Sequence, residues 1–138
     1  MPTIYSYQKH IDASITRELL MPADPQTGQP LGTELCTIDG LTYVSIPDGI
    51  SLPVDQPPEI GTPHVVTLTD ALKAQIKAAS PHVRLIDERV VVAIRSQYSV
   101  NDELKLLRLA LSTETSTYNA YVEDCRSWGR GEKTKLGL

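Results

Sequence analysis

The chain has 138 residues and a formal net charge of -4, which suits one domain or a small domain with an appended arm. The acidic balance argues against general nucleic-acid binding, and no apolar run approaches the ~20 residues that a membrane-spanning helix needs. Phe is absent and there is one Trp, so the core must rest on Leu, Ile, Val and Tyr.

Proline content and charge balance both change between residues 63 and 64. Nine of the ten prolines lie at or before Pro63. Residues 1–63 hold two basic and eight acidic residues, whereas residues 64–138 hold eleven basic and nine acidic ones. We therefore predict two parts, a β-hairpin region with a proline-rich arm at 1–63 and a helical bundle at 64–138.

The first part begins with a short extended segment at residues 3–7. Residues 1–12 lack the basic and apolar segments of a signal peptide, so we expect a protein that is made and kept in the cytoplasm, or assembled there into a larger structure. Ile15 to Leu20 fits a strand or a helical turn equally well. Residues 21–32 hold three prolines and two glycines, which favour a loop.

Residues 34–47 carry the clearest β signal in the chain. Two β-prone runs flank Asp39-Gly40, a dipeptide favoured where a tight hairpin turn needs positive φ. Pro47 ends the second run. Residues 47–63 then hold five prolines and are expected to be extended and partly stiff. A linker and an arm that lies across a partner are equally good interpretations of that segment.

Helical signals dominate the second part. Thr67 or Thr69 can cap the first helix, and Ser99 followed by Asp102 resembles a helix start. Gly129 is a natural helix end, after which we expect a short, mobile, basic tail. We place the four helices at about residues 70–79, 82–98, 100–112 and 115–129.

Each of the last three helices has an apolar stripe at helical spacing. The unbroken run Val90–Ile94 also indicates burial on more than one side of its helix. We favour a core role over an interface role for the aromatic residues of the last helix, because large side chains are scarce. The stripes are Val83, Ile86, Val90, Ile94 and Tyr98, then Val100, Leu104, Leu107 and Leu111, then Tyr118, Tyr121, Val122, Cys125 and Trp128.

No group of residues has the spacing of a catalytic or metal site. The three histidines, the acidic pairs and the two cysteines match no ligand or nucleophile motif. On a helix, neighbouring carboxylates point about 100° apart, so neither acidic pair forms a two-carboxylate site, and solvated helix faces are the favoured interpretation, with Arg84 able to pair with Asp87 or Glu88. We therefore predict no catalytic, cofactor-binding or metal-binding residue and expect reduced thiols. The residues considered are His10, His64, His82, Asp87, Glu88, Asp102, Glu103, Cys36 and Cys125.

Basic residues are more frequent toward the C-terminus. No aromatic interleaving or motif supports nucleic-acid contact there, and a docking face for an acidic protein surface is at least as good an interpretation. The residues are Lys105, Arg108, Arg126, Arg130, Lys133 and Lys135.

Two motifs stand out in the helical part. The residues are Ile94, Arg95, Tyr98, Ser99, Asp102 and Glu103, followed by Tyr118, Tyr121, Val122 and Arg126. Their stretch, residues 67–130, resembles small tail proteins of tailed bacteriophages, whose helical module carries an IR-x-x-Y-S-x-x-D-E signature and a later Y-x-x-Y-V-x-x-x-R helix. The opening IYSYQKHID is similar to the start of baseplate-associated or fibre-associated phage proteins. That family is structural, so the resemblance implies no functional residue.

The expected fold is α+β, with a small N-terminal β-hairpin region and proline-rich arm before a C-terminal bundle of about four helices. The resemblance implies a non-enzymatic virion protein, a baseplate or tail-fibre adaptor that binds other tail proteins in several symmetric copies. Its expected location is the virion tail, and the host cytoplasm during assembly. Neither a cofactor, nucleic acid nor a membrane is expected as a partner. The alternatives are a tail-fibre assembly chaperone that is absent from the mature virion and, third, a small enzyme.

Overall fold

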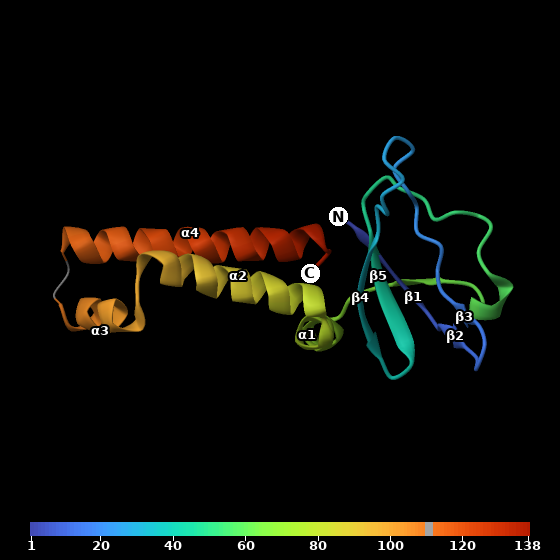
Figure 1. The fold of residues 1–138 in the computed structure, drawn as a ribbon, viewed down its shortest axis with the longest axis horizontal. Coiled ribbons are helices and arrows are strands. Elements are labelled where there is room, and N and C mark those ends of the chain that lie inside the picture. The colour runs from blue at the N-terminus through green and yellow to red at the C-terminus, as the bar shows by residue number, and fades with distance from the viewer. Residues whose placement is uncertain (110–111) are drawn as a thin grey trace. The chain divides into compact units, whose positions relative to one another are not determined.

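A computed structural model describes residues 1–109 and 112–138 (Figure 1). An antiparallel sheet with the strand order β4-β5-β1-β6 occupies the N-terminal part, beside a two-stranded sheet of β2 and β3. Four α-helices follow, so the α+β fold expected from the sequence is confirmed. The elements are β1 (Thr3–Tyr7), β2 (His10–Ile11), β3 (Thr16–Arg17), β4 (Thr33–Ile38), β5 (Leu41–Ile46), the 3-10 helix η1 (Pro58–Ile60), β6 (His64–Val66), α1 (Asp70–Ala79), α2 (Pro81–Gln97), α3 (Val100–Arg108) and α4 (Thr113–Lys135).

The chain forms two compact units. The sheet unit contains Met1–His82 and Lys135–Leu138, and the helical unit contains Val83–Thr134. Composition placed the boundary between residues 63 and 64, but β6 pairs with β1 and α1 contacts β4, so both belong with the sheet. The change in proline content marks the start of β6, and not the end of the sheet unit.

The hairpin of β4 and β5 follows the sequence prediction closely. Asp39 and Gly40 form its turn with φ values of 50° and 81°, the left-handed region that this dipeptide tolerates. The register shifts between Glu34 and Cys36, which is a β-bulge. Leu35 and Cys36 are consecutive and yet both are buried in the same cluster, a result that simple alternation does not predict.

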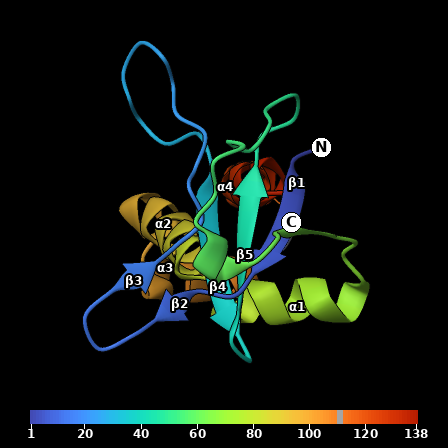
Figure 2. The same ribbon diagram turned by 90° about the vertical axis from the view of Figure 1, so that its right-hand side faces the viewer.

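Both faces of the sheet are covered. On one face Ile76 of α1 packs with Ile4 and Tyr43. On the other face Ile60 of η1 packs with Tyr7 and Val44. Figures 1 and 2 show α1 and η1 on opposite sides of the sheet. The central strand β5 is therefore covered on both sides, which explains why every residue from Thr42 to Ile46 is buried.

Part of the proline-rich segment 47–63 covers the second face of the sheet. The Gln56 side chain accepts a hydrogen bond from the Leu20 backbone N–H at 2.8 Å and donates to the Leu20 carbonyl at 3.0 Å. Ile60 is buried against the sheet. The segment is thus attached to the sheet unit at several points, where its composition allowed only a linker or an arm across a partner.

The predicted helix starts are confirmed. The Thr69 hydroxyl accepts a hydrogen bond from the Leu72 N–H at 3.1 Å. Ser99 and Asp102 form a reciprocal capping box with distances of 3.0 and 3.1 Å. Helix α3 ends at Arg108, before the predicted residue 112, and Leu111 of the predicted stripe lies outside the described residues.

The predicted end of the last helix at Gly129 is wrong. Helix α4 continues to Lys135, and Gly129 is buried within it, where a Cβ would lie 2.7 Å from the Val90 side chain. Glycine is needed there for close approach of two helices, not for helix termination. The predicted mobile tail is also wrong, because Leu136 and Leu138 pack against the cluster of Ile4.

Candidate interaction surface

Helices α2 and α4 lie side by side and antiparallel in the helical unit (Figure 1). The predicted stripe of α2 is confirmed, with Val83 and Ile94 buried and its other members half-buried. The opposite side of α2 is not covered, since Val92 is 67% exposed. The expectation that Val90–Ile94 is buried on more than one side is therefore wrong.

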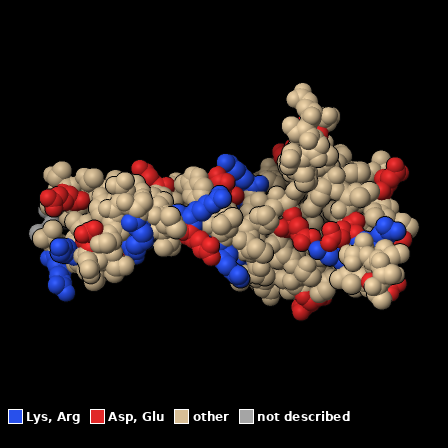
Figure 3. All heavy atoms as spheres, viewed as in Figure 1, with Lys and Arg blue, Asp and Glu red and all other residues tan. Residues whose placement is uncertain are grey.

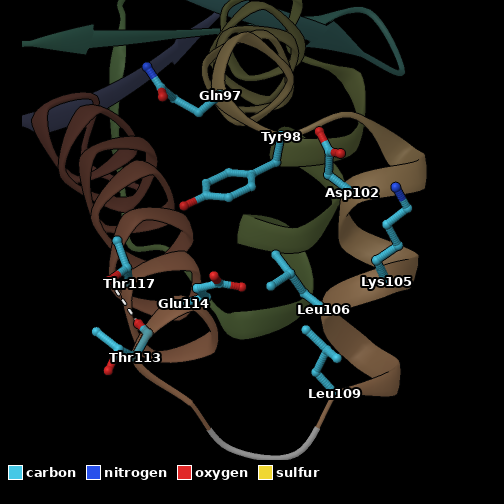
Figure 4. Close-up of a pocket in the computed structure, with 9 residues that line it drawn as sticks. All are labelled: Gln97, Tyr98, Asp102, Lys105, Leu106, Leu109, Thr113, Glu114 and Thr117. Atoms are coloured by element: carbon cyan, nitrogen blue, oxygen red, sulfur yellow. Dashed lines mark hydrogen bonds between the residues drawn. The ribbon is translucent and has the colours of Figure 1, made fainter.

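Three tyrosines join α2, α3 and α4, and we name them the tyrosine junction: Tyr98, Tyr118 and Tyr121. The ring of Tyr98 meets Tyr118 edge-on with 4.8 Å between centroids and lies 5.8 Å from Tyr121. The Tyr121 hydroxyl donates to the Ala93 carbonyl of α2 at 2.6 Å. Figure 4 shows Tyr98 pointing from the end of α2 toward α4. The junction holds the three helices by ring packing and by hydrogen bonds.

An ion pair continues the junction into α3. The Tyr118 hydroxyl donates to Glu103 at 2.8 Å, and Arg95 contacts the other carboxylate oxygen of Glu103 at 2.9 Å. The hydrogen bond from Tyr118, and then the one from Arg95, lower the pKa of Glu103. Burial, followed by the neighbouring Glu103, raises the pKa of Tyr118. The structure thus brings together residues of both sequence motifs and gives them a shared structural role.

The Glu103 contacts predict an acid-sensitive helical unit. A carboxylate with a lowered pKa stabilises the fold above its unfolded pKa of about 4.3, and this stabilisation is lost as pH falls through the lowered folded value. The variant Glu103→Gln should therefore be less stable than the wild type at pH 7, with a smaller difference near pH 3. Urea unfolding followed by circular dichroism at both pH values measures this.

The control for that experiment is Glu88→Gln. Glu88 is exposed on α2 and makes no ion pair among the residues that the structure describes. It should unfold like the wild type at both pH values. An equal loss for Glu103→Gln at pH 7 and pH 3 would contradict a role for the charged carboxylate.

Helix α3 leaves an apolar stripe uncovered, which we name the α3 stripe: Val100, Leu104 and Leu107. The sequence predicted that these residues share one face, but all three are exposed, and Leu107 is 75% exposed. No residue of α3 is buried, and Glu103 and Leu106 are only half-buried. Because residues three and four apart on a helix are neighbours, the exposed side chains form one continuous strip.

The acidic residues of α3 make polar contacts, whereas its two basic residues form no ion pair within the described residues. Asp102 belongs to the capping box, and Glu103 is paired with Arg95. Lys105 and Arg108 make no ion pair within the described ranges. Figure 3 shows basic side chains at the surface where Figure 1 places α3. The α3 stripe is therefore flanked by two cations that form no ion pair within the described residues, although the charge of Lys105 helps to lower the pKa of Asp102.

Two other members of the predicted basic set are already paired. Lys133 contacts Asp87 at 2.7 Å, and Arg130 forms an ion pair with Glu123. The sequence allowed Arg84 as a partner of Asp87 on an otherwise solvated face, whereas the structure pairs Asp87 with Lys133 of the adjacent helix α4. Of the basic residues predicted to form a docking face, Lys105 and Arg108 lie on the helix that carries the α3 stripe.

A hollow of about 500 Å³ lies beside α3 (Figure 4). Its walls combine apolar and polar groups from the ends of α2, α3 and α4, an arrangement typical of sites that receive a side chain or a small molecule. It is large enough for one or two side chains of a partner. The lining residues are Gln97, Tyr98, Asp102, Lys105, Leu106, Leu109, Thr113, Glu114 and Thr117.

The remaining sequence candidates do not converge. His10 lies in β2, His64 in β6 and His82 near the start of α2. Both cysteines are free; burial raises the pKa of Cys36, and Cys125 is half-buried. Within the described residues, no group of three or more His, Cys, Asp or Glu side chains is arranged to hold a metal ion.

The core role predicted for the aromatic residues of α4 is only partly correct. Tyr118 and Tyr121 are half-buried in the junction. Trp128 is 44% exposed, so it does not fill the core of this chain. Periodicity identified the correct helix face, but helical spacing does not show how far along α4 the neighbouring helices extend.

The helical unit thus presents an uncovered apolar strip beside the tyrosine junction, with two cations that form no ion pair within the described residues. None of the helices in the described ranges combines the length and the apolar character needed to cross a membrane. Compared with known proteins, the chain matches no protein-family model, no curated protein and no solved structure.

Proposed function

We propose that this protein is a non-enzymatic structural component of a phage tail, acting as a baseplate or tail-fibre adaptor. The observation that carries the proposal is the uncovered α3 stripe, Val100, Leu104 and Leu107, supported by the resemblance of residues 67–130 to small tail proteins. Its partners would be fibre or baseplate subunits, and several symmetric copies would be present in the assembled tail. It would reside in the host cytoplasm only during assembly.

The α3 stripe has the chemistry of an interface centre. Fully burying a Val or Leu side chain is worth about 1.5–3 kcal/mol, and a binding surface typically places such residues inside a polar rim. Lys105 and Arg108 supply that rim on α3. Helix α3 has no buried residue, so its apolar side chains contribute little to the stability of a single chain. In an assembly, the same side chains can be buried against a partner.

The tyrosine junction makes this surface suitable for an adaptor. Binding costs less when the binding residues are already held in place. Tyr118 links α4 to Glu103 of α3, and Tyr98 packs against both tyrosines of α4. The junction therefore restrains the helix that carries the stripe, and its three tyrosines belong to the motifs that resemble phage tail proteins.

Mass spectrometry of purified particles tests the proposal. In particles of the phage that encodes the chain, peptides of this protein should appear at several copies per particle, counted against a tail protein of known stoichiometry. The matched sample is the lysate before purification. Abundance in the lysate with none in the particles would refute the adaptor and would support a chaperone that leaves before maturation.

A further inference from the structure

We propose that the α3 stripe of one copy binds the sheet unit of a second copy, so that the chain assembles head to tail. This inference rests on the proposed function, because it names what covers the surface that carries that function. It goes further by assigning an occupant and a second surface on the same chain.

Pairing of α3 with α3 of another copy is disfavoured by charge. An isologous contact centred on the stripe would bring Lys105 and Arg108 of both copies into one interface. The nearby acids cannot neutralise them freely, since Asp102 caps the helix and Glu103 is bonded to Arg95 and Tyr118. The stripe therefore favours an occupant that combines apolar side chains with unpaired carboxylates.

The sheet unit has the negative net charge that such an occupant requires. It contains five basic and nine acidic residues, a balance of -4, whereas the helical unit contains eight of each. Lys9 of the sheet unit forms ion pairs with Glu34 at 2.8 Å and with Glu18 at 3.4 Å. The excess of negative charge in the chain is thus confined to the unit that would face the two free cations of α3.

Where Gln56 bonds the Leu20 backbone, the sheet unit offers both apolar and acidic groups, and we name this place the Val54 patch: Leu20, Val54 and Asp55. Val54 is 98% exposed and Leu20 is 47% exposed. Asp55 is also exposed and makes no ion pair among the described residues. A valine that buries almost nothing in its own chain is available for contact with another one.

The patch is held in shape by its neighbours. Gln56 bonds the backbone of Leu20 on both its N–H and its carbonyl, and it donates to the Pro53 carbonyl at 3.0 Å. Pro53 and Pro57 restrict the backbone on either side. These restraints reduce the conformational freedom that the patch loses on binding, which favours association.

The two surfaces are complementary. Val54 and Leu20 would cover the α3 stripe, and Asp55 would meet Lys105 or Arg108. Because the contact joins two different surfaces, each copy keeps one of each kind free for a further copy, which gives a ring or an open filament. Multiple copies in a symmetric assembly are the natural product of such a contact.

Sedimentation of the full chain tests this assembly. We expect the average mass to rise past that of a dimer as concentration increases, and to fall again at about 0.5 M salt, where the charged part of the contact is screened. Leu107→Asp and Val54→Asp should each sediment as monomers. An equal mixture of the two variants should form dimers and nothing larger, because each retains one intact surface of the opposite kind.

The controls separate assembly from folding and from general stickiness. Leu85→Asp changes an exposed leucine on α2 and should assemble like the wild type. Circular dichroism should show the same helix content in all variants. The double variant Lys105→Glu/Arg108→Glu should assemble poorly and should regain assembly when mixed with Asp55→Lys.

Three results would overturn the inference. The wild type could stay monomeric up to about 1 mM, where even a weak contact is populated. The two aspartate variants could fail to form dimers on mixing, or Val54→Asp could assemble like the wild type. The proposed function is tested separately: presence in particles together with a monomer in solution would keep the adaptor and make another tail protein the occupant of the stripe.

Discussion

Replacing Ile76 with alanine is expected to lower the free energy of unfolding of the sheet unit by about 2–5 kcal/mol. Ile76 is 0% exposed and is the one buried member of α1. Its side chain joins Ile4, Leu35 and Tyr43 in a single cluster. Removing it opens a cavity between the helix and the sheet, and the lost contacts add to the lost transfer free energy.

The measurement for Ile76→Ala is urea unfolding combined with hydrogen exchange. Amides of β1 and β5 should lose protection, because these strands lie under α1 through the same cluster. The matched control is Gln75→Ala, an exposed site on the same helix, which should change stability by less than about 0.5 kcal/mol. A loss below about 1 kcal/mol for Ile76→Ala would show that the cluster does not depend on α1.

The local signals in the sequence were reliable because they act within a few residues. The tight hairpin turn needs positive φ, which Asp39-Gly40 tolerates, and Thr69 and Ser99 each accept a hydrogen bond from a backbone N–H three positions away. These preferences require no knowledge of the rest of the chain. The hairpin and the helix starts could therefore be predicted residue by residue.

Long-range packing was beyond those signals. Gly129 fits a helix end in isolation, and only the approach of Val90 from α2 shows why a glycine is needed in mid-helix. Leu136 and Leu138 resemble part of a mobile tail in the sequence, but in the structure they pack against the cluster that contains Ile4. In both cases the residue that makes the contact is far away in the sequence, so composition and local propensity cannot predict the contact.

The candidate interaction surface was half predictable. Periodicity assigned Val100, Leu104 and Leu107 to one face, and this is correct. Periodicity reports which side chains share a face but not whether another element covers that face. In the structure, Glu103 bonds α3 to Arg95 and Tyr118, and Leu106 is half-buried, whereas the stripe itself stays exposed.

Replacing Tyr98 with alanine is expected to lower the free energy of unfolding of the helical unit by about 2–4 kcal/mol, somewhat less than for a fully buried ring because Tyr98 is half-buried. Its ring packs against Tyr118 and Tyr121 at the point where α2 gives way to α3. Without it, both tyrosines of α4 lose a ring contact, and the restraint on α3 is weakened.

Tyr98→Phe is the matched variant for this prediction. The Tyr98 hydroxyl makes no hydrogen bond among those found in the described ranges, so the phenylalanine keeps the ring contacts and should cost less than about 1 kcal/mol. Hydrogen exchange should rise in α3 and in the first turns of α4 for Tyr98→Ala alone. Equal losses for both variants would mean that the hydroxyl, and not ring packing, holds the junction. If Tyr98→Ala unfolds normally but loses self-association, the junction serves chiefly to present the α3 stripe.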